Sequence, residues 1–237
     1  MPVHHPRLLL FDVDSTLLDC GPQPREVFVA ALREIYGASG GCNGYPFYGR
    51  TDPRIVLDLL TAEGWPEAQV RERMPRMREL YLAALERGLD RERMRLLPGV
   101  VELLERLAAR RDLTVGLLTG NWEPGARTKL SRFDLNRFFR FGAFGGDGTD
   151  RDELPPVALE RAARHAGRPF RPQEALIIGD SVHDVSCAHA HGIPALAVAT
   201  GQTSAGELRA AGAEWVVADL REAYAAFGAA PPPASSG

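Results

Sequence analysis

Three short polar motifs, each placed directly after an apolar run, hold the residues of this chain that could do chemistry. They read FDVDST at residues 11–16, LLTGN at residues 117–121 and IIGDSVHD at residues 177–184. Each apolar run is typical of a short buried strand, and open α/β sheets gather their functional residues where the strands end. The motifs therefore predict one site built from segments that are far apart in the chain.

The first motif places two carboxylates, Asp12 and Asp14, two residues apart at the end of its strand. Side chains at positions i and i+2 of extended backbone project to the same side, so these anions would repel each other unless they share a cation. The pattern predicts a divalent metal ion, with one carboxylate able to attack an electrophile while the other transfers protons. The plain structural alternative is that the Asp and Thr residues of this motif only cap a helix or turn.

The other two motifs supply groups that complement the first. Thr119 and Gly120 offer a hydroxyl and a backbone N–H that could hold an oxyanion, and Asp180 is followed one helical turn later by Asp184. If the three apolar runs are strands of one parallel sheet, all these groups open onto the same edge of that sheet.

Apolar runs alternate with helical patterns over most of the chain. Expected strands cover residues 8–11, 113–118, 175–178, 195–199 and, more weakly, 215–217. Expected helices cover residues 100–110, 124–133, 156–166, 182–191 and 204–211. Strands separated by helices of this length predict an α/β fold, a Rossmann-like core with a mostly parallel sheet flanked by helices.

Residues 18–95 interrupt this alternation. They contain helical patterns at residues 24–36, 53–63 and 66–88, a glycine-rich loop at residues 37–49 and no convincing strand. We therefore expect an α-helical cap domain at residues 18–95, inserted into a core formed by residues 1–17 and 96–228. The remaining residues, 229–237 (AAPPPASSG), have the composition of a disordered tail.

The motifs DVDST, LLTGN and GDSVHD, in this order, resemble motifs I, II and IV of the haloacid dehalogenase superfamily. The inserted helical segment resembles the cap of its phosphoglycolate phosphatase-like branch, and the resemblance extends from residue 8 to residue 228. It implies a Mg²⁺-dependent phosphatase that hydrolyses a small phosphomonoester, phosphoglycolate-like or a sugar phosphate, through an aspartyl-phosphate intermediate.

The same resemblance implies a role for each matched residue. Asp12 would be the nucleophile and Asp14 the general acid/base, while Thr119 and the Gly120 backbone would bind the phosphoryl group. These roles are chemically sensible, because phosphoryl transfer depends mainly on positioning and on neutralising charge. The Mg²⁺ ligands it implies are Asp12, the Asp14 carbonyl, Asp180 and, in or behind that shell, Asp184.

One motif departs from the family pattern. The superfamily usually places a lysine before the helix that precedes motif IV, but residues 150–156 read DRDELPP here, and the single lysine, Lys129, lies elsewhere in the sequence. A cation is needed to neutralise the phosphoryl oxygens and to separate the carboxylates, and arginine can serve. We expect Arg151 to replace the lysine as a phosphate-binding residue. Arg161 is the alternative, although its mid-helix position favours a solvated face.

The same residues separate this chain from other relatives. Dehalogenases of the superfamily lack the second acid of motif I, and phosphonate-cleaving members form a Schiff base on a cap lysine, whereas residues 18–95 contain no lysine. A sugar-phosphate mutase would share every core residue and is the alternative enzyme. A non-catalytic binding protein on this fold would be expected to lack Asp12 or Asp14, and both are present.

Several residues outside these roles keep two interpretations. Arg50, in a cap loop, could bind a carboxylate or a second phosphate of the substrate, and Asn121 could line the mouth of the site. Thr51 or Asp52 could be the N-cap of the helix that follows, which is the favoured interpretation for Asp52. Trp122 fits either the mouth of the site or the cover of a core helix. A glycine-rich stretch at residues 142–148 (GAFGGDG) lacks the pattern of a nucleotide-binding loop.

The composition limits which binding partners and which cellular compartment we expect for the protein. The chain carries 31 acidic and 28 basic residues, a net charge of −3, without a basic run, which argues against nucleic acid. It has no apolar stretch of about 18 residues for a membrane span, no signal-peptide pattern, and only three cysteines. We therefore expect a cytoplasmic monomer or homodimer that acts on a small phosphorylated metabolite.

Overall fold

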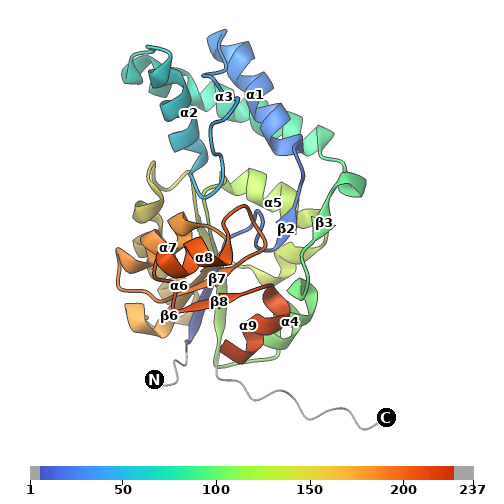
Figure 1. The fold of residues 1–237 in the computed structure, drawn as a ribbon, viewed down its shortest axis with the longest axis vertical. Coiled ribbons are helices and arrows are strands. Elements are labelled where there is room, and N and C mark those ends of the chain that lie inside the picture. Colours follow the sequence, from blue (N-terminus) through green and yellow to red (C-terminus); the bar gives the residue numbers. More distant parts are fainter. Residues whose placement is uncertain (1–5, 227–237) are drawn as a thin grey trace.

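The computed structural model describes residues 6–226, and its centre is a six-stranded sheet with the order β5-β4-β1-β6-β7-β8 (Figure 1). All neighbouring strands pair in parallel. The predicted α/β fold class is therefore confirmed. The strands are β1 (Leu8–Phe11), β4 (Thr114–Thr119), β5 (Gly142–Phe144), β6 (Ala175–Gly179), β7 (Ala195–Val198) and β8 (Trp215–Val217).

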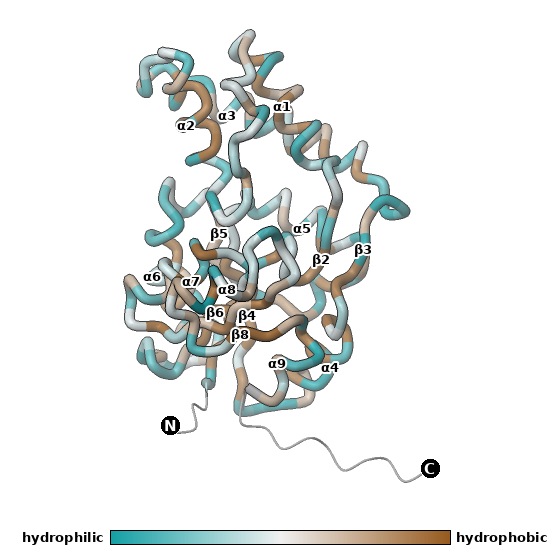
Figure 2. Tube along the Cα trace, viewed as in Figure 1, coloured by the Kyte–Doolittle hydropathy of each residue, from teal (hydrophilic) through white to brown (hydrophobic). Residues whose placement is uncertain are grey.

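Both faces of the sheet are covered by helices, which explains why its strands are apolar throughout. In β1, Leu9 and Phe11 pack into one hydrophobic cluster while Leu8 and Leu10 pack into the other, and all four are fully buried. The hydropathy trace shows the same concentration of apolar residues along the central strands (Figure 2). One face is covered by α4 (Val100–Ala108), α5 (Glu123–Ser131) and α9 (Leu220–Ala226), and the other by α6 (Leu154–Ala166), α7 (Val182–His189) and α8 (Ala205–Ala210).

A group of three helices stands above the sheet, in the segment that follows β1 (Figure 1). These helices are α1 (Gln23–Tyr36), α2 (Asp52–Ala62) and α3 (Glu67–Gly88). The chain enters and leaves this segment through two short antiparallel strands, β2 (Leu18–Asp19) and β3 (Arg95–Leu96), in which Leu18 is paired with Leu96. The segment has the helical character expected of a cap, and the boundary at residues 18 and 95 stays a prediction.

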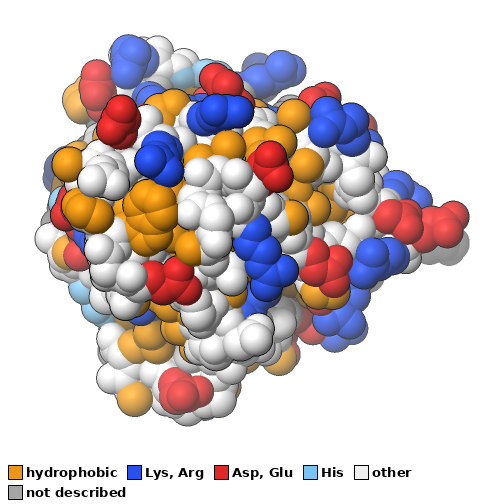
Figure 3. All heavy atoms as spheres, turned by 90° about the horizontal axis from the view of Figure 1, so that it is seen from above, with side chains coloured by type: hydrophobic (Ala, Val, Ile, Leu, Met, Phe, Trp, Pro, Cys, Tyr) orange, Lys and Arg blue, Asp and Glu red, His pale blue; other side chains and the backbone are white. Residues whose placement is uncertain are grey.

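Aromatic side chains join the helical segment to the core. Trp122, which precedes α5, stacks on Phe28 of α1 with ring centroids 6.1 Å apart and lies 5.9 Å from the ring of Tyr81 of α3. Phe28 and Tyr81 contact each other at 5.0 Å. Trp122 is almost fully buried, so it packs between the core and the cap helices. Seen from above, the molecule carries acidic and basic side chains interspersed with hydrophobic ones (Figure 3).

The main differences from the predicted elements occur where the chain is rich in glycine or where segments are short. Strand β5, which was not among the expected strands, begins the glycine-rich stretch at residues 142–148, and it pairs with β4 so that Ala143 lies opposite Leu118. The strands β2 and β3 are two residues each, too short for a periodic pattern. The tail predicted at residues 229–237 lies outside the described residues. No helix within residues 6–226 combines the length and the apolar character of a membrane span.

Candidate active site

The order of the central strands brings the three motifs together. Strand β1 lies between β4 and β6, and its last residue, Phe11, is in register with Leu117 on one side and Ile178 on the other. Asp12 continues this strand, and its backbone N–H donates to the Ile178 carbonyl at 2.9 Å. Because all three strands run in parallel, the residues after them meet at one edge of the sheet.

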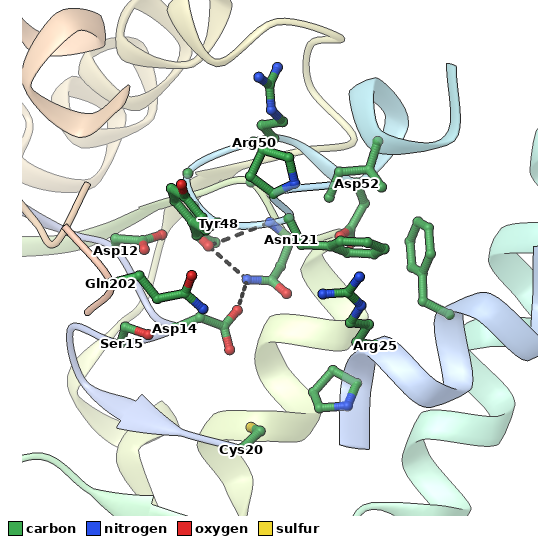
Figure 4. Close-up of a pocket in the computed structure, with 18 of the residues that line it drawn as sticks. Asp12, Asp14, Ser15, Cys20, Arg25, Tyr48, Arg50, Asp52, Asn121 and Gln202 are labelled. Carbon is green, nitrogen blue, oxygen red and sulfur yellow. Dashed lines mark hydrogen bonds between the residues drawn. The ribbon is translucent and has the colours of Figure 1, made fainter. Parts of the chain in front are cut away.

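A cavity of about 730 Å³ lies between this edge and the helical segment (Figure 4). Its aromatic lining comes from the helical segment, its basic residues come from both the segment and the core, and its carboxylates come mainly from the strand ends. Residues from the core that line it include Asp12, Asp14, Thr119, Gly120, Asn121, Lys129, Arg151 and Asp180, and those from the helical segment include Arg25, Phe47, Tyr48 and Arg50.

Three buried carboxylates, those of Asp12, Asp180 and Asp184, form a group in which one oxygen from each lies within 4.8 Å of the others. Burial raises the pKa of Asp12 to about 6, with Arg151 opposing the shift and Asp184 adding to it. Burial, together with the charges of Asp184 and Asp12, raises the pKa of Asp180 to about 9. One arginine, Arg151, contacts two of these three acids, so the ionised cluster carries net negative charge, and its oxygen donors are of the kind that Mg²⁺ prefers.

Arg151 is the arginine that reaches this cluster. Its Nη2 atom lies 3.1 Å from Asp12 Oδ1 and donates a hydrogen bond to Asp184 Oδ1, and its side chain is only 6% exposed. Its Nε atom is buried without a hydrogen-bond partner among the described residues. Arg161 instead pairs with Asp147, with both N–O distances at 2.6 Å. The geometry thus places the first candidate, and not the alternative, beside Asp12.

Asp184 is held by the first turn of α7. Ser181, the N-cap of that helix, donates to Asp184 Oδ2 from its hydroxyl at 2.6 Å and from its backbone N–H at 3.0 Å. Since the other oxygen accepts from Arg151, both oxygens already have donors. This arrangement fits a residue behind the metal ligands. Among the described residues, the carboxylate of Asp180 accepts only a long hydrogen bond from Thr16, at 3.4 Å.

Asp14 lies at the opening of the cavity, with 41% of its side chain exposed. Its Oδ2 atom accepts hydrogen bonds from Lys129 Nζ at 2.6 Å and from Asn121 Nδ2 at 2.7 Å. Lys129 also donates to Asn121 Oδ1 at 2.6 Å, and Asn121 Nδ2 donates to Thr119 Oγ1 at 2.9 Å. Asn121 thus connects the second motif to the first, and the carboxylate of Asp14 does not serve as a helix cap.

Lys129 is the residue of this site that sequence reasoning missed. It lies on α5 and is only 3% exposed. Burial lowers its pKa, but the charge of Asp14 and other neighbours outweighs this and raises the pKa overall. A sequence signal does exist, because the lysine falls on the apolar stripe of its helix, next to Leu130 and three residues after Ala126.

A loop of the helical segment closes on the end of β4. Asp52 donates its backbone N–H to the Gly120 carbonyl at 2.8 Å, and its carboxylate accepts the Trp122 N–H at 2.8 Å. The expectation that Asp52 is an N-cap was wrong, since Thr51 caps α2 by accepting from the Arg54 N–H. An N-cap residue precedes the helix and has an extended backbone conformation, as Thr51 does, whereas Asp52 is already the first helical residue.

Gly120 allows this loop to approach. A Cβ atom added there would lie 2.0 Å from the carbonyl oxygen of Arg50, which leaves no room for any other residue type. The Arg50 side chain lines the cavity, pairs with Asp58 at 3.4 Å and lies over the ring of Tyr45 at 5.4 Å. The structure therefore brings Arg50 to the cavity, and its binding of substrate stays a prediction.

Comparison with known proteins agrees with this geometry. The family described as haloacid dehalogenase-like hydrolase matches residues 9–198. The chain belongs to the haloacid dehalogenase-like hydrolases. A phosphoglycolate phosphatase of Rhodobacter capsulatus is 30% identical over 189 residues, which are 78% of this chain and 81% of that protein. A phosphoglycolate phosphatase of Pseudomonas putida is 26% identical over 91% of this chain and 78% of its own length.

A solved structure shares this fold over almost the whole chain. A hydrolase from Pseudomonas syringae superposes with a TM-score of 0.67 at 25% identity, covering 94% of this chain and 99% of the other. Membership of the haloacid dehalogenase-like hydrolases makes the chain an enzyme, and its cluster of acids lies where the first and last motifs of the chain meet. The roles of the individual site residues stay predictions.

Proposed function

We propose that this hydrolase is a Mg²⁺-dependent phosphatase that hydrolyses a small phosphomonoester through an aspartyl-phosphate on Asp12. The observation that carries the proposal is the environment of Asp12. It is a buried carboxylate at a strand end, 3.1 Å from a buried arginine, clustered with two further acids, and two residues before a carboxylate at the cavity mouth. A nucleophile, a cation for the phosphoryl oxygens and a proton-transfer group thus occupy one cavity.

The residues present fit a magnesium ion. The donors are carboxylate oxygens. Arg151 contacts Asp12 and Asp184, whereas Asp180 has no ion pair among the described residues, so a further positive charge would balance the ionised cluster. Asp12, Asp180 and the Asp14 carbonyl would hold the ion, with Asp184 behind them. When bound, Mg²⁺ neutralises charge on the phosphoryl oxygens and helps to orient the group.

In the first step, a carboxylate oxygen of Asp12 forms a bond to phosphorus while the bond from phosphorus to the ester oxygen breaks. The electron pair of that bond goes to the ester oxygen, which takes a proton from the Asp14 carboxyl group. The Arg151 guanidinium, the Thr119 hydroxyl and the Gly120 N–H would stabilise the charge on the transferring oxygens.

In the second step, a water molecule attacks the phosphorus of the aspartyl-phosphate. Asp14, now a carboxylate, accepts a proton from this water. The bond between phosphorus and the Asp12 oxygen breaks, its electron pair returns to the Asp12 carboxylate, and inorganic phosphate leaves. Both carboxylates are then restored to the states in which they started.

The substrate would be a monoester with a second polar or anionic group. Phosphoglycolate is the first compound to test, because two of the similar proteins are named for it. A sugar phosphate is the other candidate class. Arg50 and Arg25 line the cavity on the side of the helical segment, where a carboxylate or a second phosphate would meet them.

The test is a screen for phosphate release from small phosphorylated metabolites in the presence of Mg²⁺. Asp12→Asn should abolish release, while the control Asp147→Asn, which removes a charge from the pair with Arg161, should not. Release that does not depend on Asp12 would overturn the proposed nucleophile. Interconversion of a sugar phosphate without release of phosphate would identify the enzyme as a mutase instead.

We also propose that the enzyme acts in the reducing cytoplasm, as a monomer or homodimer. Its three cysteines, Cys20, Cys42 and Cys187, are buried and form no disulfide, as expected for a reducing compartment. Cell fractionation and sedimentation of the purified protein would test these two expectations.

A further inference from the structure

The single lysine of the chain is buried in the active site, yet the reaction outlined above gives it no role. Lys129 is almost fully buried, and its ammonium group lies 2.6 Å from Asp14 Oδ2 and 2.6 Å from Asn121 Oδ1. Burying an ammonium group is costly unless charged or polar partners offset the loss of water. The apolar neighbours on the same face of α5, Ala126 and Leu130, would pack as well against an uncharged side chain. The contacts with Asp14 and Asn121 therefore account for the presence of a charge.

The contacts to Asp14 are one-sided. Within residues 6–226, the hydrogen bonds to its carboxylate come from Lys129 and Asn121, and both end on Oδ2. None of the described residues donates a hydrogen bond to the other oxygen, Oδ1, and the carboxylate lines the cavity. In Figure 4 a dashed line marks the hydrogen bond that joins Asn121 to Asp14. Two donors on one oxygen fix the rotation of the carboxylate and leave the second oxygen for a reacting partner.

The donors themselves are held rigidly. Lys129 comes from a helix that packs beneath the helical segment, where Gly125 of α5 lies against Leu82 and Leu85 of α3. Asn121 donates to Thr119 as well as to Asp14, which fixes the orientation of its amide. A long side chain that is already buried loses little further freedom when Asp14 must be held in place.

We propose that Lys129, acting with Asn121, is a positioning residue for Asp14. The pair holds Oδ2 so that Oδ1 faces the ester oxygen in the first step and the attacking water in the second. This inference rests on the proposed function, because it requires Asp14 to be the acid/base. The proton still moves between Asp14 Oδ1 and the reacting oxygen, and Lys129 neither gains nor loses one.

The test uses two substrates that differ in their need for a proton. An alkyl phosphate that the enzyme hydrolyses releases an alkoxide and needs the proton from Asp14, whereas 4-nitrophenyl phosphate releases a stable phenolate without it. Because kcat/KM reports the steps up to the first irreversible one, it isolates the transfer to Asp12. For Lys129→Met we expect kcat/KM to fall about 10²-fold on the alkyl phosphate and to change little on 4-nitrophenyl phosphate.

A second readout separates positioning from structural support. On 4-nitrophenyl phosphate, kcat and KM of Lys129→Met should fall together, because Asp14 is still needed for hydrolysis of the aspartyl-phosphate. The double variant with Asp14→Asn should be no slower on the alkyl phosphate than Asp14→Asn alone. The matched control is Arg127→Met on the same helix, whose arginine contacts Glu123 and the Phe139 carbonyl, and we expect it to keep wild-type kinetics.

If Lys129→Met does not fold, as judged by circular dichroism and thermal unfolding, Asn121→Ala provides the same test through the second donor to Oδ2. Equal losses on the two substrates, or a further loss in the double variant, would overturn the inference. A wild-type enzyme that releases no phosphate from any monoester would instead overturn the proposed function. An active enzyme that shows no difference between the substrates would leave that function intact and overturn only the role of Lys129.

Discussion

Replacing Arg151 by methionine removes the guanidinium that contacts two of the three clustered carboxylates. Methionine preserves most of the length and apolar volume of the side chain, so the change mainly removes charge and N–H donors. The natural control is Arg161→Met, which removes the other candidate arginine from a partly exposed pair with Asp147. The two variants carry the same substitution at positions ten residues apart in the same region of the chain.

The expected loss of stability follows from the distance and the burial. Two unit charges 3.1 Å apart interact by about 5 kcal/mol at an effective dielectric constant of about 20. Removing one partner of a buried pair typically costs about 3–5 kcal/mol, which agrees with this figure. The Arg161 pair has side chains 32% and 20% exposed, so its loss should cost only about 0–1 kcal/mol after screening by solvent.

The loss of folding stability in Arg151→Met should depend on pH. The pKa of Asp12 is raised to about 6 although Arg151 opposes the shift, so without this arginine the pKa must rise further. A carboxyl with a raised folded-state pKa contributes stability that is full at low pH and is lost as pH rises through that pKa. The difference in stability between wild type and Arg151→Met should therefore be smaller at about pH 5, where Asp12 is largely protonated in both proteins and the lost contact with Asp184 remains, than at about pH 8.

Urea unfolding at these two pH values, in EDTA and in Mg²⁺, measures the effect on stability. Added Mg²⁺ should restore much of the stability, because it replaces the missing positive charge, whereas phosphate release should stay about 10²–10³-fold lower because the N–H donors are absent. The reasoning is refuted if Arg151→Met keeps wild-type activity. It is also refuted if Arg161→Met loses more activity than Arg151→Met.

Three further outcomes are expected. Gly120→Ala should lower phosphate release about 10²-fold, since its Cβ would lie 2.0 Å from the Arg50 oxygen and displace the cap loop; unchanged kinetics would contradict this close approach. Burial raises the pKa of Asp52 to about 7. As the pH is lowered from 7 toward 4, the free energy of unfolding of the wild type, measured with urea, should therefore increase relative to that of Asp52→Asn by roughly 1.4 kcal/mol per pH unit. Parallel curves for the two proteins would refute the raised pKa of Asp52. Mg²⁺ should raise the unfolding temperature of the wild type but not that of Asp180→Asn, and equal shifts in differential scanning fluorimetry would exclude Asp180 as a ligand.

The periodicity of the chain was enough to predict most of the fold. The run at Leu8–Phe11 is apolar on every residue, as a strand buried on both faces must be, and the structure buries it completely. Strand β5 was not predicted because its three residues include a glycine and its pairing with β4 comes from a neighbour in space. An edge strand of this length is too short to show a hydrophobic periodicity in the sequence.

The candidate site was predictable in part for a similar reason. Residues that directly follow a strand, such as Asp12 and Thr119, are located as soon as the strands are located. Asp52 and Lys129 lie on helices, where a polar residue near an apolar stripe has several plausible partners. Asp52 turned out to accept the Trp122 N–H, and Lys129 to contact Asp14, and neither contact follows from local sequence.

The sequence by itself determined the alternation of strands and helices and the residue types at the strand ends, because hydrophobic periodicity and motif chemistry are local properties. Only the tertiary structure decided that Arg151 and not Arg161 meets Asp12, and that Lys129 reaches Asp14. The physical reason is the strand order β4-β1-β6, which brings together side chains more than 100 residues apart, such as those of Asp14 and Asn121. Which buried cation balances which carboxylate depends on that arrangement, since the interaction between two charges depends on their distance in space and not on their separation along the chain.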